Sequence, residues 1–205
     1  MQTQLQKQEN KLKHGEQVHG TIQAQMTAPT IDYVIIRGAM GVGKTTTSRQ
    51  LFHELSEKGI ECSLLHADIV RKFINNREPT YRNRKLGVKN MIDIANNTIE
   101  DGYITILEGV FTDQELLNNM KNNISGKYLL VRLGADIDIN MSRNKNPDRT
   151  FVALEDKIPD AIARYESNKW NNTEEVYYHT NNISANDVAM KIVEKMGIID
   201  VDYEI

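Results

Sequence analysis

Residues 38–45 constrain the fold of this 205-residue chain more than any other segment. They read GAMGVGKT and match the pattern GxxxxGK[ST] in full. An apolar, β-branched run over Asp32–Arg37 precedes the match, and Lys44–Lys58 follows it with Leu51 and Leu55 on one helical face. A strand, a glycine-rich turn and a helix in this order predict a phosphate-binding loop inside an α/β domain.

The residues of this loop have separate expected roles. Its three glycines allow consecutive backbone N–H groups to converge on phosphate oxygens, at the positive end of the following helix. Lys44 is expected to reach the β- and γ-phosphates, Thr45 to bind Mg²⁺ through its hydroxyl, and Thr46 to donate to the α-phosphate. A chance glycine-rich turn is the alternative, and the flanking strand and helix argue against it. The predicted nucleotide-binding residues are Gly38, Ala39, Met40, Gly41, Val42, Gly43, Lys44, Thr45 and Thr46.

Beyond the loop, segments typical of strands alternate with segments typical of helices. This alternation predicts a five-stranded parallel sheet covered by helices on both faces. The expected strands are Asp32–Arg37, Cys62–His66, Tyr103–Leu107, Lys127–Leu133 and Glu175–His179. The expected helices are Lys44–Lys58, Ile69–Asn75, Arg82–Asp101, Asp113–Lys121, Leu154–Trp170 and Ala185–Met196.

The composition limits domain organisation and partners. Residues 1–30 are rich in Gln, Lys and Glu, so we expect a mobile polar tail before one domain over residues 31–205. The net charge of −3 argues against coating nucleic acid by bulk charge. No apolar run is long enough to span a bilayer, so no membrane partner is expected. The single cysteine, Cys62, favours a reducing, cytoplasmic setting.

Two classes of nucleotide-binding protein fit poorly. A switch GTPase needs an NKxD motif, and Asn144–Pro147 reads NKNP, without the aspartate. The third expected strand runs into Leu107–Val110, which reads LEGV rather than DxxG. A motor ATPase usually ends this strand in Asp-Glu and carries its own helical lid domain, whereas this strand ends in the single acid Glu108. A phosphotransferase is therefore favoured, with a nucleotide-binding ATPase or regulatory module as the alternative.

An acidic residue follows the second expected strand. Asp68 in the segment HADIVR comes directly after Cys62–His66, so it should lie at the sheet edge that faces the phosphate loop. A carboxylate there can accept the proton of an attacking hydroxyl. Arg71, on the same helical face, could bind an anionic acceptor. The alternative is that Asp68 only caps the following helix.

The phosphate loop comes first, followed by the strand–Asp-x-x-Arg step, a long helix, the segment ILEG and an Arg-rich segment. The order of these features resembles the small P-loop kinases. It is most similar to the polynucleotide-kinase, zeta-toxin and adenylylsulfate-kinase-like branch, which includes antibiotic phosphotransferases. The resemblance covers about Tyr33 to Met196. It implies the strand order 2-3-1-4-5, a short lid, Asp68 as the base that activates an acceptor hydroxyl, and Arg71 as an acceptor contact.

The same resemblance implies further site residues. Glu108 matches a family glutamate and could orient the acceptor or a Mg²⁺-bound water, although strands often end in polar residues. Arg143 and Arg149, in the expected lid loop 141–149, match arginines that stabilise charge on the transferring group; a solvated surface loop is the alternative. The segment Thr180–Asn182 matches the position beside the nucleobase.

The residues and the resemblance together predict a kinase that uses ATP and Mg²⁺, with Lys44, Asp68, Arg143 and Arg149 as catalytic residues and Arg71 and Glu108 on the acceptor side. The acceptor should carry a hydroxyl group. Basic side chains between Ile69 and Met91 favour an acceptor that already bears phosphate, and a solvated helix face explains them equally well. These side chains are Arg71, Lys72, Arg77, Arg82, Arg84 and Lys85.

Overall fold

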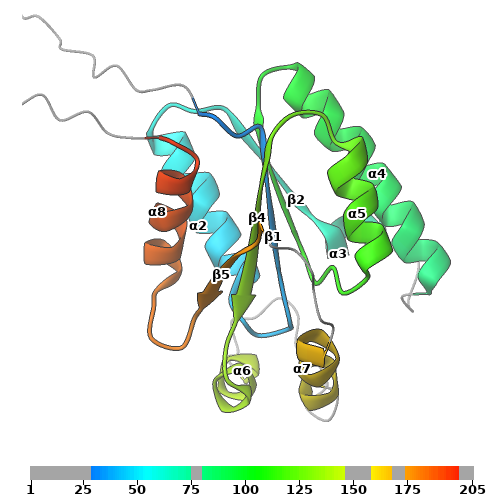
Figure 1. Cartoon of the computed structure of the whole chain (residues 1–205), viewed down its shortest axis with the longest axis vertical. Coiled ribbons are helices and arrows are strands. Elements are labelled where there is room, and N and C mark those ends of the chain that lie inside the picture. The colour runs from blue at the N-terminus through cyan, green and yellow to red at the C-terminus, as the bar shows by residue number, and fades with distance from the viewer. Residues whose placement is uncertain (1–28, 75–79, 146–157, 168–173, 199–205) are drawn as a thin grey trace, which may run out of the picture. The chain divides into compact units, whose positions relative to one another are not determined.

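The computed structural model describes residues 29–74, 80–145, 158–167 and 174–198 of the chain. Its five strands form one parallel sheet in the order β2-β3-β1-β4-β5, which confirms the predicted order (Figure 1). Because the first strand is central and its neighbours come later in the chain, the sheet is doubly wound. The strands are β1 Tyr33–Gly38, β2 Cys62–His66, β3 Ile104–Gly109, β4 Tyr128–Gly134 and β5 Val176–His179.

Helices cover both faces of this sheet, as the sequence predicts. In Figure 1, α2 and α8 lie together on one face and α4 and α5 on the other, while α6 lies below the arrowhead of β4 and contacts α7. The helices are α2 Lys44–Glu57, α3 Ala67–Lys72, α4 Tyr81–Glu100, α5 Gln114–Asn123, α6 Ile137–Asn144, α7 Ile158–Ser167 and α8 Ala185–Lys195.

The central strand β1 is buried along its whole length. Tyr33 and Ile35 pack into an apolar cluster with residues of α4 and α5. Because side chains alternate along a strand, Val34 and Ile36, which are also buried, point to the face covered by α2 and α8. Two packed layers of helices therefore hold the strands, so the residues at the carboxyl ends of the strands are placed by a rigid scaffold.

Local signals explain where several helices begin. The side chain of Thr80 accepts a hydrogen bond from the Asn83 backbone at the start of α4. Asp113 caps α5 in the same way. At α8, Ser184 and Asp187 form a reciprocal capping box.

The structure departs from the predicted elements at two places near the site. Helix α6 replaces part of the expected lid loop 141–149. Apolar periodicity did not predict this helix, because its buried residues are Asn140 and Asn144. Helix α3 begins at Ala67, directly after β2, and not at Ile69. The remainder of the expected loop, from residue 146 onward, lies outside the described residues. Within the described ranges, none of the helices combines the length and apolar character needed to cross a bilayer.

The expected tail spans residues 1–30. Residues 1–28 lie outside the described part of the chain, and residues 29 and 30 lie within it. The last residue of the expected tail, Thr30, is bound to the domain: the backbone N–H and the hydroxyl each donate to the carbonyl of Met196, both at 3.1 Å. The ordered domain therefore includes Thr30.

Candidate active site

The loop between β1 and α2 needs glycine at two positions for different steric reasons. Gly38 has φ +156°, and a Cβ there would lie 2.4 Å from the carbonyl oxygen of Leu133 on β4. Gly41 has φ +86°, and a Cβ would come within 3.0 Å of the backbone of Asn140 on α6. Any other residue would strain the backbone and push these neighbours away. The loop is therefore packed between β4 and α6.

Two side chains at the start of α2 lie at this loop. Lys44 is only 8% exposed, and its Nζ donates to the carbonyl oxygen of Ala39 at 2.9 Å. The ammonium group thus stays at the loop and does not extend into solvent. The hydroxyl of Thr45 donates to Oε1 of Glu108 at 3.4 Å. The predicted phosphate-loop residues and the glutamate that ends the third strand are therefore in contact.

Glu108 is a buried acid near the end of β3, with 7% of its surface exposed. Its Oε2 lies 2.7 Å from Nδ1 of His66, the last residue of β2. Burial by itself would raise the pKa of this carboxyl group. The hydrogen bond with His66 and the nearby charge of Lys44 outweigh burial, so the pKa of Glu108 lies below its usual value. Glu108 is therefore ionised at neutral pH and accepts hydrogen bonds at both oxygens.

Asp68 lies in the first turn of α3 with its side chain 64% exposed. The N-cap of this helix is His66, and no side chain caps it. The alternative that Asp68 serves only as a helix cap is therefore wrong. Arg71, one turn further along, donates to Oδ1 of Asp68 at 3.3 Å, as expected for two residues on one helical face.

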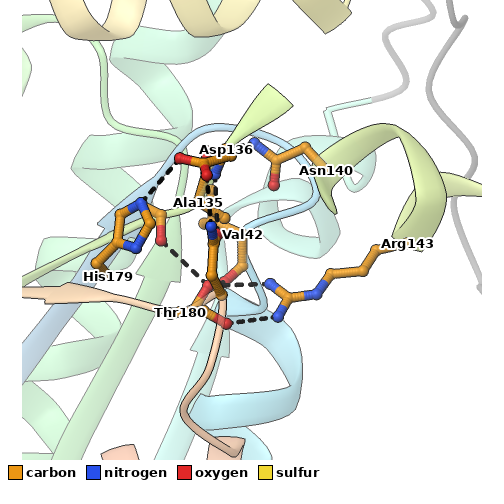
Figure 2. Close-up of polar contacts among 9 residues, drawn as sticks. Val42, Ala135, Asp136, Asn140, Arg143, His179 and Thr180 are labelled. Atoms are coloured by element: carbon orange, nitrogen blue, oxygen red, sulfur yellow. Dashed lines mark hydrogen bonds and ion pairs between the residues drawn. The ribbon is translucent and has the colours of Figure 1, made fainter. Parts of the chain in front are cut away.

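Arg143 lies on α6 and is bound to the residue that follows β5 (Figure 2). Its Nη1 donates to the hydroxyl of Thr180 at 2.9 Å, and its Nη2 to the carbonyl of the same residue at 2.6 Å. Burial lowers the pKa of the Arg143 guanidinium from its usual value, although an arginine remains charged. The expectation that this arginine belongs to a loop is wrong, and Arg149 lies outside the described residues.

Thr180 connects this arginine to the phosphate loop. Its hydroxyl oxygen lies 3.0 Å from the carbonyl oxygen of Val42 and 3.1 Å from that of Gly134, so its one proton is shared between these two acceptors, and the residue is buried (Figure 2). Asn181, beside it, exchanges two hydrogen bonds with Asp136. The side chains of Thr180 and Asn181 thus bind other parts of the protein, and the contact with a nucleobase stays a prediction.

The sequence interpretation missed two of these connections. His66 was expected to end a strand, with a position facing the site left open, but its contact with Glu108 was not predicted. The two residues are register partners in the parallel β2–β3 pair. The strand order 2-3-1-4-5 already makes those two strands neighbours, so it contained the signal. The contact of Thr180 with Val42 joins residues far apart in the sequence, and no local pattern indicates it.

The donors at the loop suit a magnesium ion. The described residues contain no cluster of three or more His, Cys, Asp or Glu side chains that could hold a metal by themselves. Thr45 and Glu108 instead offer one hydroxyl and one carboxylate beside the phosphate loop. Mg²⁺ typically takes one or two such protein oxygens and completes its shell with substrate phosphates and water. The residues present therefore fit this ion.

The basic side chains predicted on the acceptor side lie on α3 and at the start of α4. Arg71 is half-buried, and the backbone of α3 at this residue packs against Gly87 of α4. Phe73 is 82% exposed next to them. Arg77 lies outside the described residues. The other members of this group, Lys72, Arg82, Arg84 and Lys85, are exposed.

Solved structures with the same fold include two kinases and a resistance protein. An adenylylsulfate (APS) kinase from Mycobacterium tuberculosis, in complex with AMPPNP and APS, has a TM-score of 0.66 at 15% identity, over 83% of this chain and 99% of that chain. A gluconokinase from Sinorhizobium meliloti has a TM-score of 0.62 at 9% identity, over 83% and 94%. The tunicamycin resistance protein of Deinococcus radiodurans has a TM-score of 0.60 at 14% identity, over 82% and 97%.

The family model described as adenylylsulphate kinase matches residues 31–152, which is more than half of the chain. The matched segment includes the phosphate loop, the strand–Asp68–Arg71 step, Glu108 and Arg143. The fold, the strand order and this match agree with the small P-loop kinases that the sequence resembles. The chain belongs to the adenylylsulphate kinase family of P-loop kinases.

Proposed function

We propose that this protein transfers the γ-phosphate of ATP to a hydroxyl group of an acceptor, in a reaction that depends on Mg²⁺. The observation that carries the proposal is that the phosphate loop and the polar or charged side chains proposed to act in this transfer follow or end strands β1, β2 and β3 at one edge of the sheet. In an open α/β sheet this edge is where ligands bind. The side chains are Lys44, Thr45, Asp68 and Glu108.

On the nucleotide side, the loop N–H groups and the start of α2 bind phosphate oxygens. Lys44, already held at the loop through Ala39, places a positive charge beside the β- and γ-phosphates. Thr45 and Glu108 would hold the magnesium ion, since their oxygens contact each other beside the phosphate loop. The ion, when bound, neutralises negative charge on the phosphate oxygens. The contact between Thr45 and Glu108 favours this role for the glutamate over a direct contact with the acceptor.

On the acceptor side, Asp68 is the proposed base. The acceptor oxygen attacks the γ-phosphorus, the bond from that phosphorus to the β–γ bridging oxygen breaks, and ADP leaves. The proton of the acceptor hydroxyl passes to the carboxylate of Asp68. Its exposed position in the first turn of α3 leaves it accessible to an acceptor, and the ion pair with Arg71 orients it.

The arginines predicted to stabilise charge keep that role in this proposal. A guanidinium has five N–H donors, and two of those of Arg143 are engaged by Thr180. We assign the remaining donors to the nucleotide phosphates. Arg149, which lies outside the described residues, is the second candidate for the same role.

The acceptor is proposed to carry a phosphate in addition to its hydroxyl. The group of basic side chains on α3 and α4 supports this choice, since arginine binds phosphate with two parallel hydrogen bonds. The family match and the M. tuberculosis structure with bound APS support a nucleotide-like acceptor. The exposed ring of Phe73 beside these charges is suited to pack on an aromatic group.

The proposal is tested by acceptor-dependent release of ADP. A panel of adenylylsulfate, nucleosides, nucleotides, sugars and oligonucleotide ends is incubated with ATP, Mg²⁺ and the purified chain. We expect one class to stimulate ADP release many-fold and to yield a phosphorylated product. Lys44→Ala should abolish this stimulation, because no nearby group replaces its charge. Arg49→Ala, an exposed position on the same helix, is the matched control and should retain activity.

The alternative is a nucleotide-binding ATPase or regulatory module without an acceptor. It predicts a slow hydrolysis of ATP that every member of the panel leaves unchanged. That result, obtained with folded protein that binds ATP, would reject the kinase proposal.

A further inference from the structure

His66 connects two parts of the site that come from different strands. It is the last residue of β2, and Glu108 is its register partner on β3. Nδ1 of His66 lies 2.7 Å from Oε2 of Glu108, and the two side chains are 14% and 9% exposed. An ionised carboxylate can only accept, so the imidazole donates from Nδ1. This is a short hydrogen bond in a largely dehydrated place, where such bonds are strong.

The two oxygens of Glu108 have different partners. Oε2 is held by His66, and Oε1 accepts from the hydroxyl of Thr45 at 3.4 Å. Rotation about the last side-chain bond of a glutamate is otherwise soft. The hydrogen bond to one oxygen therefore fixes the direction of the other oxygen, which faces the phosphate loop.

The imidazole of His66 does not cap the helix that follows it. His66 occupies the N-cap position of α3, but its side chain makes no cap hydrogen bond there. The ring is directed toward Glu108, while the backbone leads directly into the helix that carries Asp68. One residue thus connects the acid beside the phosphate loop with the segment that bears the proposed base.

We propose that His66 is a positioning residue, which holds the Glu108 carboxylate so that Oε1 and the Thr45 hydroxyl together bind the magnesium ion of the nucleotide complex. This inference rests on the proposed function, in which those two residues hold the ion. Groups that orient metal ligands typically change metal affinity by about 10- to 100-fold when they are removed. The affinity for ATP without Mg²⁺ should not depend on His66, because the loop N–H groups and Lys44 bind the phosphates.

The test measures ATP affinity by calorimetry with Mg²⁺ and with EDTA. For His66→Ala, we expect the gain in affinity that Mg²⁺ provides to fall by about 10-fold or more, with the affinity in EDTA unchanged. His66→Asn keeps an N–H donor close to the position of Nδ1 and should recover most of the gain. His53→Ala is the matched control, since His53 is an exposed histidine on α2. Equal affinity losses with and without Mg²⁺, or no loss, would overturn the inference.

Further variants keep the outcomes distinguishable. If His66→Ala does not fold, His66→Asn is compared with His66→Gln. The amide donor of glutamine corresponds to the other ring nitrogen, Nε2, so only asparagine should keep the Mg²⁺-dependent gain in ATP affinity. An equal gain in these two variants would overturn the inference. In a Glu108→Gln background, replacement of His66 should cause no additional loss of the Mg²⁺-dependent gain. If Thr45→Ala and Glu108→Gln leave that gain intact, the magnesium assignment itself fails. If they reduce it and His66→Ala does not, only the role of His66 fails.

Discussion

Arg143 donates two hydrogen bonds to Thr180, one to its hydroxyl and one to its carbonyl oxygen, and the same hydroxyl donates to Val42 in the phosphate loop. An arginine on α6, the turn after β5 and the loop after β1 are thereby joined by one threonine side chain. A carbonyl of the phosphate loop held in this way keeps the adjacent N–H groups in a fixed orientation, which favours phosphate binding.

Thr180→Val is expected to weaken both the fold and the nucleotide site. Valine has nearly the same shape but lacks the hydroxyl, so two buried carbonyl groups and the Arg143 guanidinium each lose a partner. The expected loss is about 1–3 kcal/mol of unfolding free energy, together with a weaker affinity for ATP. Urea denaturation and calorimetry measure the two effects. An unchanged ATP affinity would show that the threonine does not organise the loop.

Glu175→Ala is expected to be strongly destabilising. Arg37 on β1 is fully buried, and its Nη2 donates to Oε2 of Glu175 at 2.9 Å. Arg132 on β4 has its Nε 3.3 Å from the same oxygen. Removing the carboxylate from a buried ion pair typically costs about 3–5 kcal/mol of unfolding free energy. Urea denaturation measures this loss.

The control for Glu175→Ala is Glu57→Ala. Glu57 lies 4.0 Å from Nδ1 of His53 in an exposed pair, and its replacement should change the unfolding free energy by less than about 0.5 kcal/mol. Similar effects of the two variants would contradict the assignment of Arg37 and Glu175 as a buried ion pair.

Shortening the chain tests where the ordered domain begins. We expect a variant that starts at Pro29 to keep the melting temperature and activity of the full chain, because the preceding segment is polar in composition. A variant that starts at Ile31 lacks both hydrogen bonds from Thr30 to Met196 and should melt at a lower temperature. Thermal denaturation of the two variants decides this. A large loss already at Pro29 would show that the removed segment supports the domain.

Much of this fold could be predicted from local sequence. The phosphate loop has a specific pattern in a specific context, and the alternation of strands and helices implies a parallel sheet. Helix α6 escaped prediction because Asn140 and Asn144, rather than apolar residues, form its buried stripe. Periodicity in apolar residues cannot reveal such a helix. Asn140 is buried there because the backbone of α6 packs against Gly41, which is a tertiary effect.

Some features of the candidate site could be predicted from local sequence, and others depend on tertiary structure. Lys44, Thr45 and Asp68 could be found because each occupies a fixed position after a strand. The contacts of His66 with Glu108 and of Thr180 with Val42 depend on which strands become neighbours in space. Residue type and spacing along the chain do not contain that information until the strand order is known.

The replacement Asp68→Asn tests the central claim most directly. Asparagine keeps the shape of the side chain and removes the proton acceptor, so phosphate transfer should fall by roughly 10²–10⁴. Asp68 is exposed and does not cap α3, so the melting temperature should hardly change.

The decisive measurement determines ATP affinity and the rate of transfer to the identified acceptor on one preparation of Asp68→Asn. The account predicts an unchanged ATP affinity and a transfer rate reduced by roughly 10²–10⁴. Transfer at the wild-type rate would contradict it and remove Asp68 from the mechanism.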